Sequence, residues 1–207
     1  MNVTIVDFGL GNLRSLERKL SLSGLSVAVS SDPEAVEAAR HIILPGVGNF
    51  GPAMERLIST GLATAIKEAV LLRGIPVLGI CLGMQLLTEW SAESRSSGLG
   101  LLPGRAQQLR SLVGSTLPVP HLGWSRVDWR HPRMWPHHEL MPLDCYFAHS
   151  YHVVCDDELV LASAVYGLPF VAAIAAGPVV GVQFHPEKSS RSGIAALCNL
   201  LELQASR

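Results

Sequence analysis

One cysteine stands where the sequence predicts a nucleophile. The segment Gly79-Ile80-Cys81-Leu82-Gly83 lies between an apolar run at 75–78 and a helix-like stretch at 84–87. A strand-to-helix turn of this kind is so tight that residues without a Cβ fit best at its flanks, and it exposes the central side chain. It also places the sulfur beside the unpaired N–H groups of a helix start, which favour thiolate over thiol. We therefore predict a nucleophilic Cys81; the alternative is a small buried core residue.

A base and a carboxylate follow near the other end of the chain, at His185-Pro186-Glu187. Proline favours extended backbone at the residue before it, and in extended backbone residues two apart point to the same side. A carboxylate that accepts one imidazole N–H fixes the tautomer and leaves the other ring nitrogen for the sulfur. The three side chains would then act as nucleophile (Cys81), general base and acid (His185) and orienting group (Glu187). Taken alone, the segment also fits a polar turn after a strand.

Attack on an amide carbonyl creates an oxyanion that needs hydrogen-bond donors. The backbone N–H of Leu82, directly after the nucleophile, is one candidate. The second is Val47 in Pro45-Gly46-Val47-Gly48, because glycines on both sides let its peptide approach the site or reorient. Each such donor lowers the barrier by about 3 kcal/mol. The alternative for this segment is an ordinary glycine-rich turn, and the fragment Gly9-Leu10-Gly11 is too incomplete to assign a nucleotide.

The elements that must position these groups alternate in the first half of the chain. Strands are expected at 3–6, 27–29, 42–44 and 76–80, and helices at 13–22, 34–39, 54–58 and 62–72. Asp32 and Pro33 mark the start of the second helix, while Gly24 and Gly74 mark the ends of the first and fourth. Apolar strands separated by helices predict a parallel sheet that is covered on both faces.

The second half predicts an extension of that sheet. Proline, glycine and short alternating stretches at 106–109 and 124–129 favour antiparallel strands, and the chain returns to strands at 170–175 and 179–184 and a helix near 193–203. We expect an α/β fold with a mostly parallel sheet, helices on both faces and an antiparallel extension, in a single domain over residues 1–207. Ligands bind at the carboxyl ends of parallel strands, so the segments after these strands should meet at one site.

Composition limits the partners. A formal charge of -1 and only 16% charged residues give neither a basic stripe nor an acidic tail, so we expect no nucleic-acid or membrane partner. Four cysteines without a C-x-x-C pair favour reduced thiols in a cytoplasmic protein. His137 and His138 are adjacent but have no third ligand at a suitable spacing, so we expect neither metal nor cofactor. The first seven residues have the pattern of a strand and not that of a charged leader with a long apolar stretch, so we expect no signal peptide. We also expect no membrane span.

Together, Gly79-Ile80-Cys81-Leu82-Gly83-Met84-Gln85 and Val182-Gln183-Phe184-His185-Pro186-Glu187-Lys188 resemble the signature of class I glutamine amidotransferases. Segments elsewhere narrow the resemblance to the glutaminase subunits of imidazole glycerol phosphate synthases over essentially the full chain; they lie at 7–15, 44–48, 120–124 and 147–151. Two departures stand out. Ala148 replaces a larger aliphatic residue usual in the family, and the stretch 130–144, with Trp135, matches no known segment.

The resemblance implies that glutamine is hydrolysed to glutamate through a thioester on Cys81. The ammonia would pass to a separate (β/α)8-barrel cyclase subunit, which makes imidazole glycerol phosphate and a carboxamide ribotide, AICAR, in histidine biosynthesis. Glu93 would pair with the α-ammonium of glutamine, and backbone donors near Ser150 with its α-carboxylate. The full set implied for substrate binding is Gly48, Gln85, Glu93, His149, Ser150 and Tyr151. The set implied for the cyclase-facing surface is Asn12, Trp124, Tyr146 and Lys188.

Alternatives remain for several of these residues and for the function. Gln85 also fits an exposed helix face, Glu93 a loop charge and Trp124 a core position. The chain as a whole could be a stand-alone cysteine hydrolase of γ-glutamyl compounds, or a non-catalytic binding subunit that keeps the motifs as relics. The intact Cys81, His185 and Glu187 favour catalysis. The glycines around Val47 further predict that glutamine hydrolysis is weak until the cyclase docks.

Overall fold

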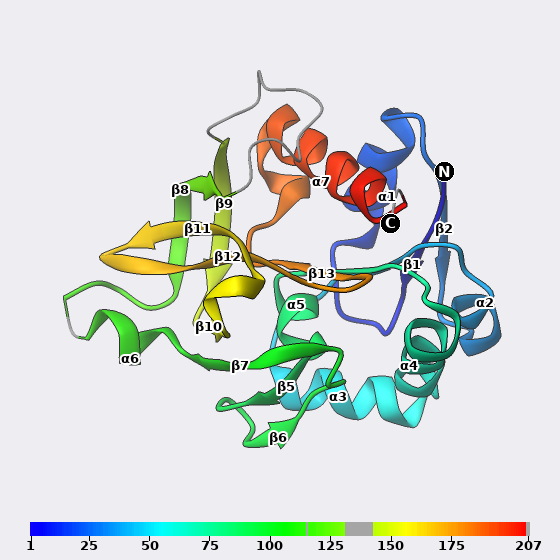
Figure 1. Cartoon of the computed structure of the whole chain (residues 1–207), viewed down its shortest axis with the longest axis horizontal. Helices are drawn as coiled ribbons and strands as arrows, with labels where there is room; N and C mark the ends of the chain where they lie inside the picture. Colours follow the sequence, from blue (N-terminus) through cyan, green and yellow to red (C-terminus); the bar gives the residue numbers. More distant parts are fainter. Residues whose placement is uncertain (115, 131–142, 206–207) are drawn as a thin grey trace.

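A large twisted sheet runs through the molecule, with helices on both faces (Figure 1). The structure is a computed structural model that describes residues 1–114, 116–130 and 143–205. Within these residues, nine strands form the main sheet in the order β2-β1-β3-β4-β13-β12-β11-β8-β9. The fold class expected from the sequence is confirmed.

The first five strands in that order are parallel to one another. They are β2 (Ser26–Ser30), β1 (Asn2–Val6), β3 (Ile42–Leu44), β4 (Val77–Ile80) and β13 (Val179–Val182). The helices between them are α1 (Leu13–Leu22), α2 (Pro33–Glu37), α3 (Phe50–Ser59), α4 (Leu62–Arg73) and α5 (Leu82–Leu87). Asp32 caps α2 through a bond to the backbone of Glu34, and Gly74 ends α4 in a left-handed conformation, as predicted.

The antiparallel extension is also confirmed. It consists of β12 (Leu168–Ala176), β11 (Val160–Tyr166), β8 (His121–Trp129) and β9 (Leu143–His149). The prediction that 106–109 joins it is wrong. Those residues belong to β7 (Leu102–Gln108) and the start of α6 (Leu109–Val113), and β7 lies in a second sheet.

In the described part of the chain, this second sheet has four strands in the order β10-β7-β5-β6. The other three are β5 (Thr88–Ser91), β6 (Ser96–Ser97) and β10 (Tyr151–Val154). Two short 3-10 helices, η3 (Asp157–Leu159) and η4 (Pro186–Lys188), and the final helix α7 (Ser190–Ala205) complete the fold. The alternation of residues in β7 is the same whichever sheet it joins, so the sequence pattern does not distinguish them.

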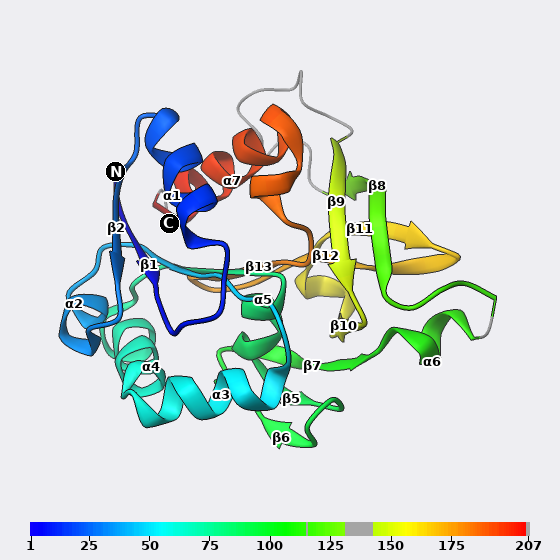
Figure 2. The same ribbon diagram turned by 180° about the vertical axis from the view of Figure 1, so that it is seen from behind.

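Two apolar clusters hold the helices onto the main sheet. On one face α1 and α7 lie together, and on the other face lie α3 and α4 (Figures 1 and 2). Leu16 and Leu20 of α1 share the first cluster with Leu197 of α7. Phe50 and Leu57 of α3 belong to the second, with several residues of α4. No helix in the described part of the chain has both the length and the apolar character to cross a membrane.

Candidate active site

The backbone turns sharply at Cys81. Cys81 joins β4 to α5 with φ +54° and ψ -108°, a region that residues with a Cβ rarely adopt. A Cβ on Gly83 would lie 1.8 Å from the carbonyl oxygen of Leu44, and one on Gly79 would lie 2.7 Å from the backbone of Gly83. The turn therefore closes only with glycine at both flanks, which confirms the predicted elbow. The prediction that the turn exposes its central side chain is wrong, because Cys81 is only 5% exposed.

Substitution of Gly83 by alanine is expected to lower the free energy of unfolding by about 3 kcal/mol. The added methyl group would overlap the backbone of β3, which cannot move away alone. Gly51→Ala is the matched control: Gly51 is also helical, but its Cβ would meet only the side chain of Ser94, at 3.1 Å. That variant should stay within about 1 kcal/mol of the parent. Equal losses for both variants in urea unfolding would contradict this account.

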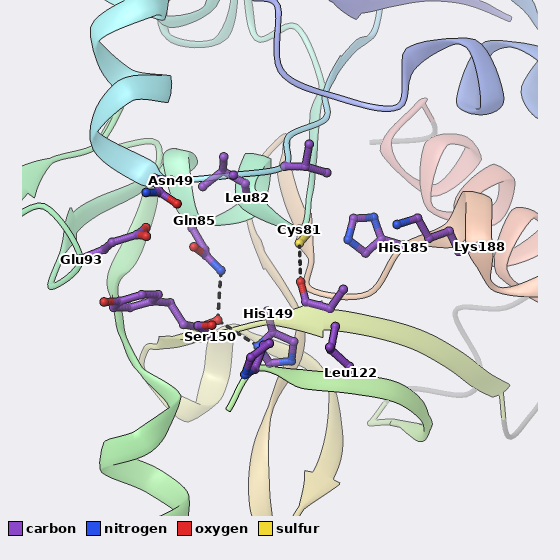
Figure 3. Close-up of a pocket in the computed structure, with 15 residues that line it drawn as sticks. Asn49, Cys81, Leu82, Gln85, Glu93, Leu122, His149, Ser150, His185 and Lys188 are labelled. Atoms are coloured by element: carbon purple, nitrogen blue, oxygen red, sulfur yellow. Dashed lines mark hydrogen bonds between the residues drawn. The ribbon is translucent and has the colours of Figure 1, made fainter. Parts of the chain in front are cut away.

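A cavity of about 370 Å³ opens beside the elbow (Figure 3). It brings together ten residues that the sequence analysis assigned to catalysis, the oxyanion hole or substrate binding: Val47, Gly48, Cys81, Leu82, Gln85, Glu93, His149, Ser150, Tyr151 and His185. Cys81 and His185 lie at one end of the cavity and Glu93 at the other. Three of the strand-end segments, at 45–51, Cys81 and His185, thus meet at one site, as predicted, whereas the segment after the first strand, 8–12, contributes no residue to this cavity.

His185 and Glu187 form a buried pair behind the sulfur. The imidazole Nδ1 lies 2.9 Å from Oε1 of Glu187, and both side chains are buried. Burial acts to lower the pKa of His185, but hydrogen bonds and electrostatic interactions with Cys81 and Glu187 outweigh it and raise this pKa to about 10. The imidazole is therefore protonated at neutral pH. It faces the sulfur of Cys81 with one nitrogen and the Glu187 carboxylate with the other, the order expected for the triad.

The local backbone of the pair differs from the prediction. Only His185 is extended, and residues 186–188 form the short helix η4 with Pro186 at its first position. Proline suits that position because its φ is already near the helical value and it has no N–H to leave unpaired. His185 donates its backbone N–H to Tyr146 (2.9 Å), and the buried Ser189 hydroxyl donates to the carbonyl of His185 (2.6 Å). These bonds fix the backbone of His185 to β9 and to Ser189, the residue directly after η4.

The other end of the cavity is polar, and hydrogen bonds to the backbone hold its side chains in place. Gln85 is buried, not on an exposed helix face, and its Nε2 donates to the carbonyl of Tyr151 at 3.0 Å. Glu93 lines the cavity, and its Oε2 accepts the backbone N–H of Phe50 (2.9 Å) at the start of α3. The carbonyl of Ser150 is bonded to Leu109. One carboxylate oxygen of Glu93 is therefore fixed by α3, while the side chain borders the cavity.

The sequence comparisons agree with this geometry. The family described as glutamine amidotransferase class-I matches residues 4–201. The chain belongs to the class I glutamine amidotransferase family. Its relatives include proteins named "Imidazole glycerol phosphate synthase subunit HisH". The one from Moorella thermoacetica is 45% identical over 205 residues, covering 97% of this chain and 94% of the relative. The one from Halalkalibacterium halodurans is 45% identical, with 94% and 92% covered.

Solved structures show the same fold. A structure described as a glutamine amidotransferase has a TM-score of 0.77 at 17% identity and covers 98% of both chains. The structure of PurLQS from Thermotoga maritima has a TM-score of 0.72 at 20% identity, with 97% of both chains covered. At these identities the likeness shows the fold alone.

Three of the four cyclase-facing residues implied by the resemblance, Trp124, Tyr146 and Lys188, form a cluster on this amidotransferase. Trp124 is 54% exposed, which rules out a core position for it. Its ring meets that of Tyr146 edge-on at 5.9 Å, and the Lys188 ammonium lies 5.7 Å from the centre of the Tyr146 ring. Lys188 also lines the cavity, so the cluster adjoins its mouth. Asn12 lies apart from this cluster, in a small hollow with Val47 and Glu187.

Sequence reasoning missed four residues that line the amidotransferase cavity: Asn49, Pro120, Leu122 and Ala148. Pro120 and Leu122 lie within the segment that narrowed the family resemblance, and Ala148 was noted only for its small size. Trp135, His137 and His138 lie outside the described residues. Among the described residues, no group of three or more histidine, cysteine or acidic side chains is placed to hold a metal ion.

Beneath the cavity, His149 and His121 form a buried imidazole pair. Their facing nitrogens, Nε2 and Nδ1, are 3.2 Å apart, and Nδ1 of His149 lies 2.9 Å from the carbonyl of Tyr151. Because a carbonyl only accepts, His149 donates there and must accept from His121. Burial lowers the pKa of His149 to about 3 and that of His121 to about 4. Both imidazoles are therefore neutral in the folded protein at neutral pH.

The amidotransferase should consequently lose stability as the pH falls from about 6.5 to about 4. The folded-state pKa values lie below the unfolded ones, so the unfolded chain binds more protons in this window and stability decreases. Each histidine contributes about 1 kcal/mol per pH unit. In His121→Phe, which keeps an aromatic ring between Phe147 and Tyr166, the slope should be smaller. An unchanged slope of unfolding free energy against pH would contradict this.

Proposed function

We propose that this chain is the glutaminase subunit of an imidazole glycerol phosphate synthase. It hydrolyses glutamine to glutamate and supplies the ammonia to a (β/α)8-barrel cyclase subunit, with which it forms a heterodimer in histidine biosynthesis. The observation that carries the proposal is the strained Cys81 facing a protonated His185 at the edge of a polar cavity. The relatives named HisH point to the same activity.

Each triad residue has a defined task in this mechanism. The Cys81 thiolate attacks the side-chain amide carbon of glutamine, and the imidazolium of His185 protonates the departing ammonia. Neutral His185 then takes a proton from water, which attacks the thioester and releases glutamate. Glu187 holds Nδ1 of His185, which keeps the ring aligned throughout. The backbone N–H groups of Leu82 and Val47 are the proposed oxyanion donors.

The opposite end of the cavity suits the amino-acid group of glutamine. Glu93 supplies a carboxylate for the α-ammonium, and the turn at Ser150 supplies backbone donors for the α-carboxylate. The cavity places these groups and Cys81 at its two ends, so an extended glutamine would present its amide to the sulfur. We propose Gly48, Gln85, His149 and Tyr151 as the remaining binding residues.

The loop that carries Val47 supports dependence on the partner. Gly46 packs so closely that a Cβ there would be 3.0 Å from that of Leu82, and Gly48 has φ +102°. The loop thus rests on the elbow, and glycine on both sides lets the Val47 peptide turn without steric cost. Docking of the cyclase would orient its N–H toward the oxyanion. We further propose a single cytoplasmic domain that uses neither cofactor nor metal and binds neither nucleic acid nor membrane.

The proposal is tested by glutamate release from the chain alone, from the chain with a barrel cyclase, and from that complex with the cyclase's ribotide ligand. We expect slow release alone and an increase of about 10²-fold or more in the liganded complex. Full turnover alone, with γ-glutamyl peptides used as well as glutamine, would instead support the stand-alone hydrolase. Failure of an electrophilic glutamine analogue to modify Cys81 would support the non-catalytic subunit.

Trp124→Ala is expected to raise the Kd for the cyclase by about thirtyfold, because exposed tryptophans at interface centres commonly contribute about 2 kcal/mol. Leu72→Ala is the control, since Leu72 is 79% exposed on α4 and does not line the cavity. Titration of labelled cyclase gives both affinities. Equal affinities for the two variants would place the interface elsewhere.

A further inference from the structure

A chain of side-chain amides connects the substrate end of the cavity to the sulfur. Nε2 of Gln85 donates to the carbonyl of Tyr151 at 3.0 Å and to Oε1 of Gln183 at 3.2 Å. Nε2 of Gln183 in turn donates to Sγ of Cys81 at 3.7 Å. Gln183 directly follows β13, two residues before His185, and its side chain is completely buried. The mechanism described above assigns it no task.

The carbonyl of Tyr151 fixes which group donates and which accepts in each hydrogen bond of this amide network. The carbonyl of Tyr151 can only accept, so Gln85 must turn its NH₂ group toward it. The second hydrogen of that NH₂ group then requires the carbonyl oxygen of Gln183, which leaves the NH₂ group of Gln183 for the sulfur. Rotating Gln183 by half a turn would set donor against donor at Gln85 and place an oxygen against the sulfur. A single arrangement of the network therefore satisfies both amides.

We propose that Gln183 is a further catalytic residue, which stabilises the thiolate of Cys81 by donating a hydrogen bond to it, and that Gln85 positions Gln183. The inference rests on the proposed role of Cys81 as nucleophile. An amide donor gains most when its acceptor is charged and shielded from water, and the 5% exposure of Cys81 provides that shielding. The neutral thiol can donate to the carbonyl of Ala148, 3.9 Å away, but its sulfur is only a weak acceptor, so the bond from Gln183 strengthens when Cys81 ionises.

The hydrogen bond from Gln183 to the sulfur would favour two steps of the reaction. It favours the thiolate before attack on glutamine, and it favours the thiolate again as leaving group when the thioester is hydrolysed. In the thioester itself the sulfur is a weak acceptor, so the bond contributes least to the intermediate that must be broken down. His185 and Gln183 thus approach the same sulfur from one segment of chain, one with a charged donor and the other with a neutral donor.

A buried glutamine elsewhere in the fold gives the contrast. Gln204 in α7 donates to the carbonyls of Val77 (2.9 Å) and Pro178 (2.8 Å). Both acceptors are backbone groups, so Gln204 joins elements of the fold. Gln183 differs because its NH₂ group is directed at the reacting atom. Gln204→Met therefore serves as the matched control for Gln183→Met.

The test is the pH dependence of Cys81 alkylation by iodoacetamide, measured by peptide mass spectrometry on the full chain. Glutamine takes no part, so the result does not depend on the proposed glutaminase activity. In Gln183→Met the midpoint of the alkylation profile should rise by about one pH unit, so alkylation below the midpoint should slow about tenfold. In Gln204→Met the midpoint should not move, even though the chain loses two buried hydrogen bonds.

Gln183→Glu gives a second measurement that does not depend on how the methionine variant folds. Glutamate has the same shape and still accepts the bond from Gln85, but it places a negative charge beside the sulfur. The midpoint should rise further than in the methionine variant, because a neighbouring like charge disfavours the thiolate. An unchanged midpoint in a folded Gln183 variant would overturn the proposal. A raised midpoint in a chain that hydrolyses no glutamine would instead refute the glutaminase function alone.

In the complex with the cyclase, Gln183→Met should lower kcat for glutamine about tenfold with little change in KM. The ammonia-driven reaction should be unaffected, since it bypasses the sulfur. A rise in KM at constant kcat would show that Gln183 acts through substrate binding and not through the thiolate, and would overturn the assignment.

Discussion

Cys81→Ala should abolish synthesis driven by glutamine while synthesis driven by added ammonium salt continues. The variant lacks the nucleophile, so the glutaminase rate should fall by about 10⁴-fold or more. In the proposed complex the cyclase can take its nitrogen from any source of ammonia, and its reaction site lies on the cyclase subunit and not on this chain. The measurement compares product formation by the complex with each nitrogen source. The expected result is a complex that has lost one nitrogen source and kept the other.

Cys145→Ala is the control for this experiment. Cys145 is also buried, and burial raises the pKa of its thiol to about 12, so it is a neutral core residue at working pH. Both nitrogen sources should support synthesis in that variant. Loss of both activities in Cys81→Ala would show instead that Cys81 holds the structure or the interface together.

Glu187→Gln should shift the alkaline limb of the profile of kcat for glutamine hydrolysis against pH to lower pH. The pKa of His185 is held at about 10 by Cys81 and Glu187 against burial, so removal of the carboxylate charge lowers it. The imidazolium that protonates ammonia is lost as the pH rises through this pKa, which in the variant happens earlier. The NH₂ group of the introduced glutamine can also donate to Nδ1 of His185 and so stabilise the wrong tautomer, and kcat near neutral pH should therefore fall by about 10²-fold or more.

The profile of kcat against pH, measured in the complex, checks this. Glu89→Gln is the control, because Glu89 is exposed and its carboxylate accepts the backbone N–H of Gly104. The raised pKa of His185 also affects the free energy of unfolding. The interaction of protonated His185 with Glu187 contributes its full stabilisation below about pH 6.5, and this contribution is lost as the pH rises through about 10. An alkaline limb at the same pH in Glu187→Gln would show that the Glu187 carboxylate does not raise the pKa of His185.

The parallel half of the fold was predictable because its signals are local. Strands of continuous apolar residues alternate with helices whose ends are marked by Asp32 and Gly74, and each mark acts within a few residues. The elbow was predictable for the same reason: Gly79 and Gly83 are required by the backbone on either side of Cys81. The distant His185 was connected to Cys81 only by the family resemblance and by the rule that strand ends meet.

The features that escaped prediction depend on contacts between distant segments. Helix α3 begins at Phe50, earlier than its apolar pattern suggests, because Glu93, which is distant in the sequence, accepts the Phe50 N–H. Pairing of β7 with β10 is likewise decided by tertiary packing, since alternation alone fits either sheet. Gln183 lay within a motif chosen for its neighbours, and only the orientation fixed through Gln85 directs its amide to the sulfur.

The most direct test of the account is to quench the complex with acid during turnover of glutamine and to map the covalent adduct. We predict a γ-glutamyl group on Cys81, with Cys145, Cys155 and Cys198 unmodified. Steady release of glutamate with Cys81 unmodified, or an adduct on another cysteine, would contradict the central claim that this sulfur is the nucleophile.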